Sequence, residues 1–436
     1  MLGAMASSEA RHAPAARSAE APDATDAPDA EKAPDADKRL KSGDKKPKKK
    51  GRWRRRLAIA ALLMPLLGVG AWLAVHHVPG VGPWVANTLR SLFGNEFVAW
   101  LEDTVYGAED WVNQKTKANE PPKALWEVPP ETAVPTATAT PEPDAPPPFS
   151  LAKIGPMHDN LATGGDGVWV PLVDPRKPDD RVRALKTFVH PDKQRSWSIV
   201  AIVAVDLSQV DLHAVAGRHE PESKTPEAKS YERKAVIPAE HHDALIAAFN
   251  GGYKSTHGDY GMKIDGVTLV PPRNLACTIA KMKDGSFLID GWEKAKEREA
   301  EMEWLRQTPI CMYDDGEPHP ALAMDSMGWG ASSVSKTTVI RRSALGLSKD
   351  GKVLFIGIGD HVTGRAIAQA LVHAGASDVA QLDVNFSFPK FLLYEQKEEG
   401  LHAVPLTENF EYDADQYVGT RSQRDFFYLV RRAEGA

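Results

Sequence analysis

The sequence predicts an α+β fold: a mixed but mainly antiparallel sheet with hairpins and a few packed helices. In the C-terminal two-thirds of the 436 residues, Asp-Gly pairs separate short apolar runs, and few stretches have helical periodicity. Ahead of this domain come a polar tail, one long apolar run and a proline-rich segment. They predict a disordered tail, one transmembrane helix and a linker.

Residues 1–56 are expected to be a disordered cytoplasmic tail. Ala, Pro, Asp, Lys and Ser dominate them, so too few large apolar side chains are present to offset the entropy lost on ordering. From Lys38 to Arg56 the tail is strongly basic, a pattern typical of a solvated tail or of a patch for nucleic acid or phospholipid. Its position directly before an apolar run favours the membrane, and no nucleic-acid partner is expected.

The run Leu57–Val75 carries no charge and has about the length, roughly 20 residues, that a helix needs to cross a bilayer. We therefore predict a transmembrane helix at 57–77, in contact with membrane lipid. A cleaved signal peptide is the alternative, but the run is long for one and no cleavage site follows. Lys and Arg crowd its N-terminal side, which predicts a cytoplasmic N-terminus and an extracytoplasmic C-terminal domain. The Ala- and Pro-rich composition suggests a bacterial inner membrane with the domain in the periplasm.

Residues 78–118 are expected to form an amphipathic juxtamembrane segment, as one helix or two short ones, because apolar residues recur there at helical spacing. The segment either lies in the membrane interface and contacts an envelope partner through residues 84–111, or it packs on the distal domain. Residues 119–148 are rich in Pro, Ala and Thr, which predicts a stiff extended linker. The folded domain is placed at 149–436.

Within this domain, short apolar runs predict strands at Trp197–Asp206, Val210–Ala216 and Ala244–Phe249. Asp-Gly pairs predict three hairpins, at residues 265–266, 284–285 and 350–351. Glu293–Leu305 is expected to be a charged surface helix. Gly364–Ala374 is expected to be an amphipathic helix that Thr363 and Gly375 cap, followed by a strand that ends at Asp383.

Cys277 and Cys311 are the two cysteines of the chain. Outside the cytoplasm a disulfide is permitted, and two cysteines can pair in only one way. The alternative is two buried free thiols.

Common catalytic signatures are missing from the sequence. It has no G-x-S-x-G, H-E-x-x-H or P-loop motif, and GIGDHVTG at 357–364 lacks the third glycine of a dinucleotide loop. We predict no cofactor and no metal site.

Polar residues instead follow the ends of predicted strands. Asn250, Gly251, Gly252 and Tyr253 end a buried strand, and two glycines let a backbone approach a ligand closely. An ordinary turn is the alternative. Arg341 and Arg342 open another strand, where an arginine can hold a phosphate or make a surface ion pair.

Asp383 lies at the carboxyl end of a predicted inner strand. A carboxylate is costly to bury there without a partner or a role. Asp360 and His361 end the neighbouring strand, although a single histidine at such a place is more often structural.

These segments resemble the phosphodiester glycosidase family. FNGGY at 249–253, with GMKIDG at 261–266, is similar to the family's Asn-Gly-Gly-aromatic segment and the hairpin that follows it. RSALGLSKDGKVLFI at 342–356 is similar to its Arg-Thr-Ala-Ile-Gly hairpin, and VTGRAIAQALVHAGASDVAQLD at 362–383 to its helix and strand ending in Leu-Asp. The family usually continues with Gly-Gly-Gly-Ser, whereas this chain has Val384-Asn385-Phe386-Ser387.

The resemblance implies a membrane-anchored extracytoplasmic hydrolase that cleaves a sugar-1-phosphate diester or a related envelope glycan. By this resemblance Arg342 clamps the phosphate, Asp383 is the base or nucleophile, and Asp360 or His361 is the partner acid. The residues implied in binding the glycan or sugar-phosphate substrate are Asn250, Gly251, Gly252, Tyr253, Asn385 and Ser387. Because the glycines after Asp383 are replaced, the alternatives are a catalytically impaired glycan-binding module and a structural component of an envelope complex.

Overall fold

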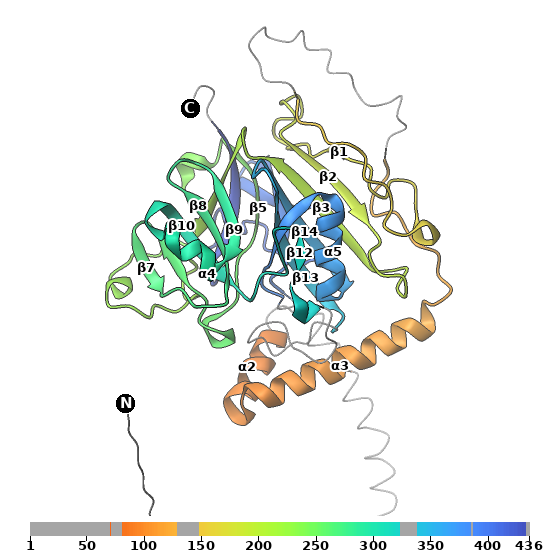
Figure 1. Ribbon diagram of the computed structural model, residues 1–436, viewed down its shortest axis with the longest axis horizontal. Helices are drawn as coiled ribbons and strands as arrows, with labels where there is room; N and C mark the ends of the chain where they lie inside the picture. The colour runs from red at the N-terminus through yellow and green to blue at the C-terminus, as the bar shows by residue number, and fades with distance from the viewer. Residues whose placement is uncertain (1–69, 71–80, 129–147, 323–337, 385–386, 433–436) are drawn as a thin grey trace, which may run out of the picture. The chain divides into compact units, whose positions relative to one another are not determined.

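The computed structural model describes residue 70 and residues 81–128, 148–322, 338–384 and 387–432 (Figure 1). The chain divides into two units after Val69, and every described residue belongs to the second unit, Gly70–Ala436. The predicted tail, 1–56, lies outside the described residues, as does most of the predicted linker.

The prediction of a single-pass membrane protein is corrected. No helix in the described ranges is both long and apolar enough to span a bilayer. Of the predicted span, 57–77, only Gly70 is described. The two helices that follow are unsuited for physical reasons: α2 (Val81–Phe93) has 13 residues, and α3 (Asn95–Thr116) carries five carboxylates.

The predicted mixed sheet is also corrected, since the strands form three sheets in which neighbouring strands pair antiparallel. The eight-stranded sheet runs, in spatial order, β1 (Val170–Pro171), β2 (Ala184–Val189), β3 (Ile199–Asp206), β14 (Val353–Val362), β13 (Ile340–Ser348), β15 (Ala376–Gln381), β11 (Tyr313–Asp314) and β12 (Glu317–Pro318). The second sheet runs β7 (Val267–Val270), β6 (Met262–Ile264), β10 (Met302–Thr308), β8 (Cys277–Met282) and β9 (Phe287–Gly291). The third runs β17 (Gly400–Pro405), β16 (Phe391–Lys397), β5 (Leu245–Asn250), β18 (Phe426–Arg431) and β4 (Val210–Val215).

Helices are few among the described residues. Besides α2 and α3 they are α4 (Trp292–Ala295) and α5 (Gly364–Ala374), with 3-10 turns at Asp159–Leu161, Glu227–Lys229, Ala239–His241, Ser255–His257, Lys296–Glu301 and Pro320–Leu322. α5 forms as predicted: the Thr363 side chain accepts a hydrogen bond from the Ala366 N–H, and Gly375 ends the helix at a φ of 115°. Its buried face packs on the eight-stranded sheet, beside β14 in Figure 1.

The predicted helix at Glu293–Leu305 is confirmed only as far as Glu301, and its last four residues form a strand. Helical structure stops at Glu301, and β10 begins at Met302. β10 lies between β6 and β8, and its Trp304 is buried in the largest apolar core, to which strands of all three sheets contribute. Pairing with distant strands therefore decides this conformation over the local helical pattern.

α3 contacts the domain directly. Asp110 accepts hydrogen bonds from Arg195 Nε and Nη2, at 2.7 and 2.6 Å, and both side chains are mostly buried. One turn earlier, Tyr106 packs against an apolar cluster that contains Tyr253 and Val384. Of the interpretations for residues 84–111, these contacts fit packing on the domain; an envelope partner remains a prediction.

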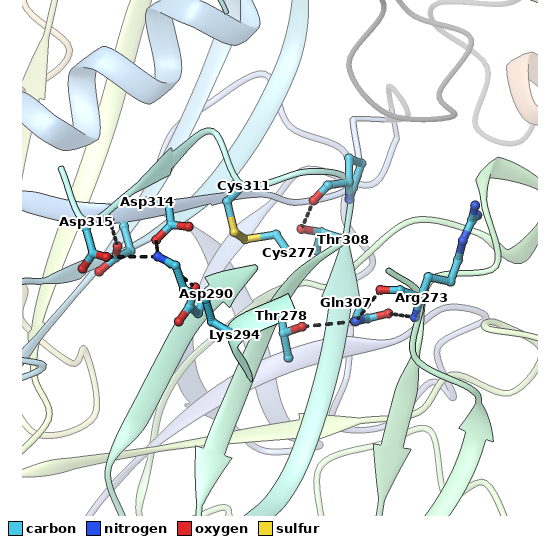
Figure 2. The surroundings of a disulfide bond; sticks show 12 residues. Arg273, Cys277, Thr278, Asp290, Lys294, Gln307, Thr308, Cys311, Asp314 and Asp315 are labelled. Atoms are coloured by element: carbon cyan, nitrogen blue, oxygen red, sulfur yellow. Dashed lines mark hydrogen bonds and ion pairs between the residues drawn. A yellow bond between two sulfur atoms is a disulfide. The ribbon is translucent and has the colours of Figure 1, made fainter. Parts of the chain in front are cut away.

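Cys277 and Cys311 are joined by a disulfide between the start of β8 and the loop after β10 (Figure 2). Their Cα atoms are 4.6 Å apart and 34 residues apart in sequence. β8 and β10 are antiparallel neighbours, and Cys277 N–H donates to the Pro309 carbonyl at 3.0 Å. The link therefore fastens the loop after β10 to β8, the strand that pairs with β10 in the second sheet.

Removing this disulfide is expected to lower the free energy of unfolding by about 3–4 kcal/mol, because closing a loop of this length restricts the unfolded chain. The test is urea unfolding of the full chain carrying Cys277→Ala and Cys311→Ala. Wild-type protein unfolded in the presence of reductant is the control, and its free energy of unfolding should fall by a similar amount. Equal urea midpoints for oxidised and reduced wild-type protein would contradict the expectation.

Candidate functional site

Four strand ends meet around Asn250. This residue ends β5, and its amide Nδ2 donates to Ser343 Oγ of β13 at 2.9 Å and to the Asp383 carbonyl at 3.3 Å. Asp383, two residues after β15, donates its N–H to the Gly251 carbonyl at 3.1 Å. The fourth strand, β18, follows Arg424 and Asp425 directly. Residues as much as 173 positions apart in the sequence, Gly252 and Asp425, thus join one buried polar cluster.

Asp383 is 2% exposed, and its carboxylate accepts a hydrogen bond from Arg424 Nη1. The Arg424 guanidinium also lies 3.3 Å from the centre of the Phe388 ring, a cation–π contact. Burial lowers the pKa of Arg424, and the Asp383 charge acts in the opposite direction. The pair is therefore a desolvated salt bridge, and removal of either charge alone should strongly destabilise the fold.

Asp425 forms a second buried pair, with Arg306 of β10. Arg306 Nε and Nη2 donate to its two carboxylate oxygens, at 2.8 and 3.1 Å. Arg306 is 0% exposed and also donates to three backbone carbonyls, those of Tyr253, Tyr260 and Gln307. The sequence analysis missed Arg306, Arg424 and Asp425.

The two glycines after Asn250 are held by this second pair. Gly252 N–H donates to Asp425 Oδ2 at 2.8 Å, and Gly251 N–H donates to the Asp425 carbonyl at 3.1 Å. A Cβ on Gly251 would lie 2.3 Å from Asp425 Oδ2, and one on Gly252 would lie 2.7 Å from Arg306 Cζ. Glycine is therefore required here by close approach.

Gly251→Ala is expected to lower the free energy of unfolding by about 3 kcal/mol, because the new methyl group overlaps a buried carboxylate and a backbone carbonyl. Gly164→Ala is the matched control, since no atom lies within 4 Å of the Cβ added there. Thermal unfolding followed by circular dichroism measures both. Equal melting temperatures for the two variants would contradict the close approach.

Arg342 is fully buried on β13. It donates to the carbonyls of Thr338 (2.9 Å) and Val362 (3.1 Å) and to Gln381 Oε1 (3.3 Å). Gln381 in turn donates its amide to the Tyr253 hydroxyl. Burial raises the pKa of Tyr253, while Arg342 lowers it and Asp383 raises it, so both charges act on this phenol. Gln381, the last residue of β15, therefore links Arg342 to Tyr253, and Asp383 follows it by two residues.

Asp360 and His361 end β14 at another part of the site. Asp360 pairs with Arg341 at 3.5 Å. His361 has a φ of 55°, a region that L residues rarely adopt. No described contact joins Asp360 or His361 to Asp383. Of the remaining predicted residues, Asn385 lies outside the described ranges and Ser387 is half-buried.

Lys390 is a further buried cation that the sequence analysis missed. Its backbone N–H donates to Asn250 Oδ1 at 3.2 Å, and its Nζ lies 3.5 Å from Gln416 Oε1. Burial lowers the pKa of Lys390 to about 8. Among the described residues of the cluster, four buried cations (Arg306, Arg342, Arg424 and Lys390) face two buried carboxylates (Asp383 and Asp425). This balance favours an anionic ligand.

Asp314, Asp315 and Asp378 form the acidic group closest to a metal-ligand arrangement in the described part of the chain. Lys294 Nζ already donates to Asp314 at 2.8 Å and to Asp315 at 3.0 Å (Figure 2), and Asp378 accepts from the Asp315 N–H at 2.7 Å. An ammonium group thus balances these charges, and the group is an ion-pair cluster.

Comparison with known proteins gives a distant structural resemblance. No family model matches the chain, and no curated protein matches it in sequence. The catalytic domain of zebrafish N-acetylglucosamine-1-phosphodiester alpha-N-acetylglucosaminidase, auto-inhibited by its pro-peptide, is 16% identical over 60% of this chain and 87% of that domain, with a TM-score of 0.36. A hypothetical protein from Synechocystis is 10% identical over 57% of this chain and 62% of its own, with a TM-score of 0.31. The similarity is distant.

Proposed function

We propose that this chain is a hydrolase that cleaves a sugar-1-phosphate diester at the cluster around Asp383. The observation that carries the proposal is the buried set of three arginines and Lys390 near a carboxylate pair and the two buried glycines that follow β5. Guanidinium groups bind phosphate oxygens with two parallel hydrogen bonds, and such contacts are strong where water is excluded. The sequence resemblance of the segments that carry Asn250, Arg342 and Asp383 supports the same chemistry.

In the proposed reaction, a water oxygen bonds to the anomeric carbon while the bond from that carbon to the phosphate oxygen breaks. The sugar leaves with a free hydroxyl, and the phosphate leaves as a monoester. Arg342 neutralises the phosphate charge, and Asp383 takes the proton from water or forms the glycosyl intermediate. Arg424 orients the carboxylate of Asp383. A phosphate is a good leaving group, so charge stabilisation matters more than strong acid catalysis.

A glycan-binding module without turnover is the second candidate. Asp383 is almost completely buried, and its carboxylate is engaged by Arg424 while its backbone N–H and carbonyl bond to Gly251 and Asn250. A buried residue that is fixed through both its side chain and its backbone in this way favours a structural role. In that case the cluster stabilises the fold and the ligand is bound without bond cleavage.

The test is incubation of the full chain with the methyl phosphodiester of N-acetylglucosamine 1-phosphate in water enriched in oxygen-18. We expect free sugar and methyl phosphate, with the label in the sugar, because the carbon–oxygen bond breaks. Label in the phosphate would indicate a phosphodiesterase and contradict the proposal. Saturable binding of the diester with no product would support the binding module.

A further inference from the structure

A separate cavity of about 610 Å³ lies beside β4, the edge strand of the third sheet. Its walls come from residues 213–216, the segment 231–241, the β6–β7 turn and the start of β10. The volume is within the roughly 300–1,000 Å³ of small-molecule sites. None of the described residues that line it belongs to the cluster around Asp383, so the cavity is a separate candidate site.

One wall of the cavity is aromatic and held rigidly. The His213 ring stacks on Tyr428, with centroids 4.9 Å apart and planes 16° apart. A hydrogen bond of 2.7 Å joins the Tyr428 hydroxyl to His241 Nδ1, and His213 Nε2 lies 3.3 Å from the Asp211 carboxylate. The His213 ring also lies 5.0 Å from the His241 ring, centroid to centroid, and its side chain lines the cavity and is 23% exposed, so part of a rigidly held ring is accessible from the cavity. Such surfaces accept the apolar face of a sugar ring.

The polar part of the wall is balanced in charge. Its three lysines and three carboxylates are Lys234, Lys263, Lys283, Glu232, Asp265 and Glu303. Asp265 accepts a hydrogen bond from the Tyr231 hydroxyl at 2.6 Å, and Lys263 and Glu303 pair with Glu299 and Lys281 at 3.4 and 3.3 Å. Burial and the neighbouring His213 lower the pKa of His241, which keeps its ring neutral near pH 7. A neutral ligand with many hydroxyl groups suits this lining better than an anion does.

We infer that this cavity binds a neutral saccharide, with one sugar ring on His213 and its hydroxyl groups bonded to the surrounding lysine and carboxylate side chains. The inference does not rest on the proposed hydrolase, because it concerns different residues and a lining that is balanced in charge. The Asp383 cluster has an excess of buried cations, whereas this cavity has none. A peptide adding to the free edge of β4 is a different occupant, and the experiment below separates the two.

The experiment is calorimetric titration of the full chain with three neutral trisaccharides, maltotriose, cellotriose and triacetylchitotriose. We expect at least one to bind, and His213→Ala to weaken it about 10-fold through loss of the stacking surface. His402→Ala is the matched control: this histidine also lies on a strand, is 20% exposed and pairs with a carboxylate at 3.3 Å, but does not line the cavity. It should leave the affinity unchanged.

Circular dichroism establishes that each variant is folded. If His213→Ala is not folded, Tyr231→Phe takes its place as the test variant. It removes one hydroxyl that hydrogen-bonds at the cavity wall and should weaken trisaccharide binding about 3-fold. The inference is overturned if none of the three trisaccharides binds, if the His402 and His213 variants lose equal affinity, or if only glucose 1-phosphate or an extended hexapeptide binds.

Discussion

Asp383→Asn is expected to lower the free energy of unfolding by about 3–5 kcal/mol. The substitution keeps the shape of the side chain but removes the charge that balances Arg424, which is 3% exposed. An unpaired guanidinium is then left in a site without water. Arg424→Gln should destabilise the protein by a similar amount, because it removes the guanidinium that pairs with the buried Asp383 carboxylate.

The double variant Asp383→Asn, Arg424→Gln separates this effect from general damage. It removes both charges and leaves two neutral amides, so it should recover at least about 2 kcal/mol relative to the sum of the single variants. Urea unfolding of the four proteins measures the coupling. The exposed pair Arg298–Glu301, neutralised in the same way, is the control and should couple by less than about 0.5 kcal/mol. Strict additivity at Asp383 and Arg424 would contradict the ion pair.

Arg306→Met is expected to have a comparable effect, about 4 kcal/mol or failure to fold. Methionine fills similar volume, but the Asp425 carboxylate loses both of the hydrogen bonds that Arg306 donates, and the Tyr253 and Tyr260 carbonyls each lose a donor. The glycine bend at Gly252 depends on the same carboxylate, so its geometry should change too.

Soluble yield and thermal unfolding of the full chain measure this prediction. Arg306→Lys is the comparison variant, because it keeps the positive charge but cannot make the two parallel hydrogen bonds of a guanidinium. Its melting temperature should lie between those of the wild type and Arg306→Met. A melting temperature for Arg306→Met within 2 °C of wild type, on the scale of roughly 2–4 °C per kcal/mol, would show that the buried pair contributes little.

Local features of the fold could be predicted from the sequence. All three Asp-Gly hairpins form, with Gly266, Gly285 and Gly351 at φ values of 75°, 84° and 70°. These turns need a residue that tolerates positive φ, and the sequence supplies it at each. Helix α5 was predictable for the same reason, because the residues that cap it, Thr363 and Gly375, adjoin it in the sequence.

Features that depend on distant partners could not be predicted. β10 takes its strand conformation from β6 and β8, so the helical pattern of 293–305 was misleading. Arg306 and Asp425 are 119 residues apart, and nothing near either residue indicates the other. Arg424 has one usable signal, since the pair Arg424-Asp425 directly precedes the apolar run of β18 and is therefore buried with it. The hydropathy of 57–75 indicates only that a segment is apolar, and the membrane anchor drawn from it was corrected above.

The most direct test of the proposed hydrolase is the rate at which the double variant Asp383→Asn, Arg424→Gln releases sugar from the methyl phosphodiester. Because both buried charges are gone, this protein should be folded yet lack the carboxylate that the reaction needs. We predict a rate at least about 1,000-fold below that of the wild-type chain. Release at the wild-type rate by the folded double variant would contradict the assignment of the chemistry to Asp383.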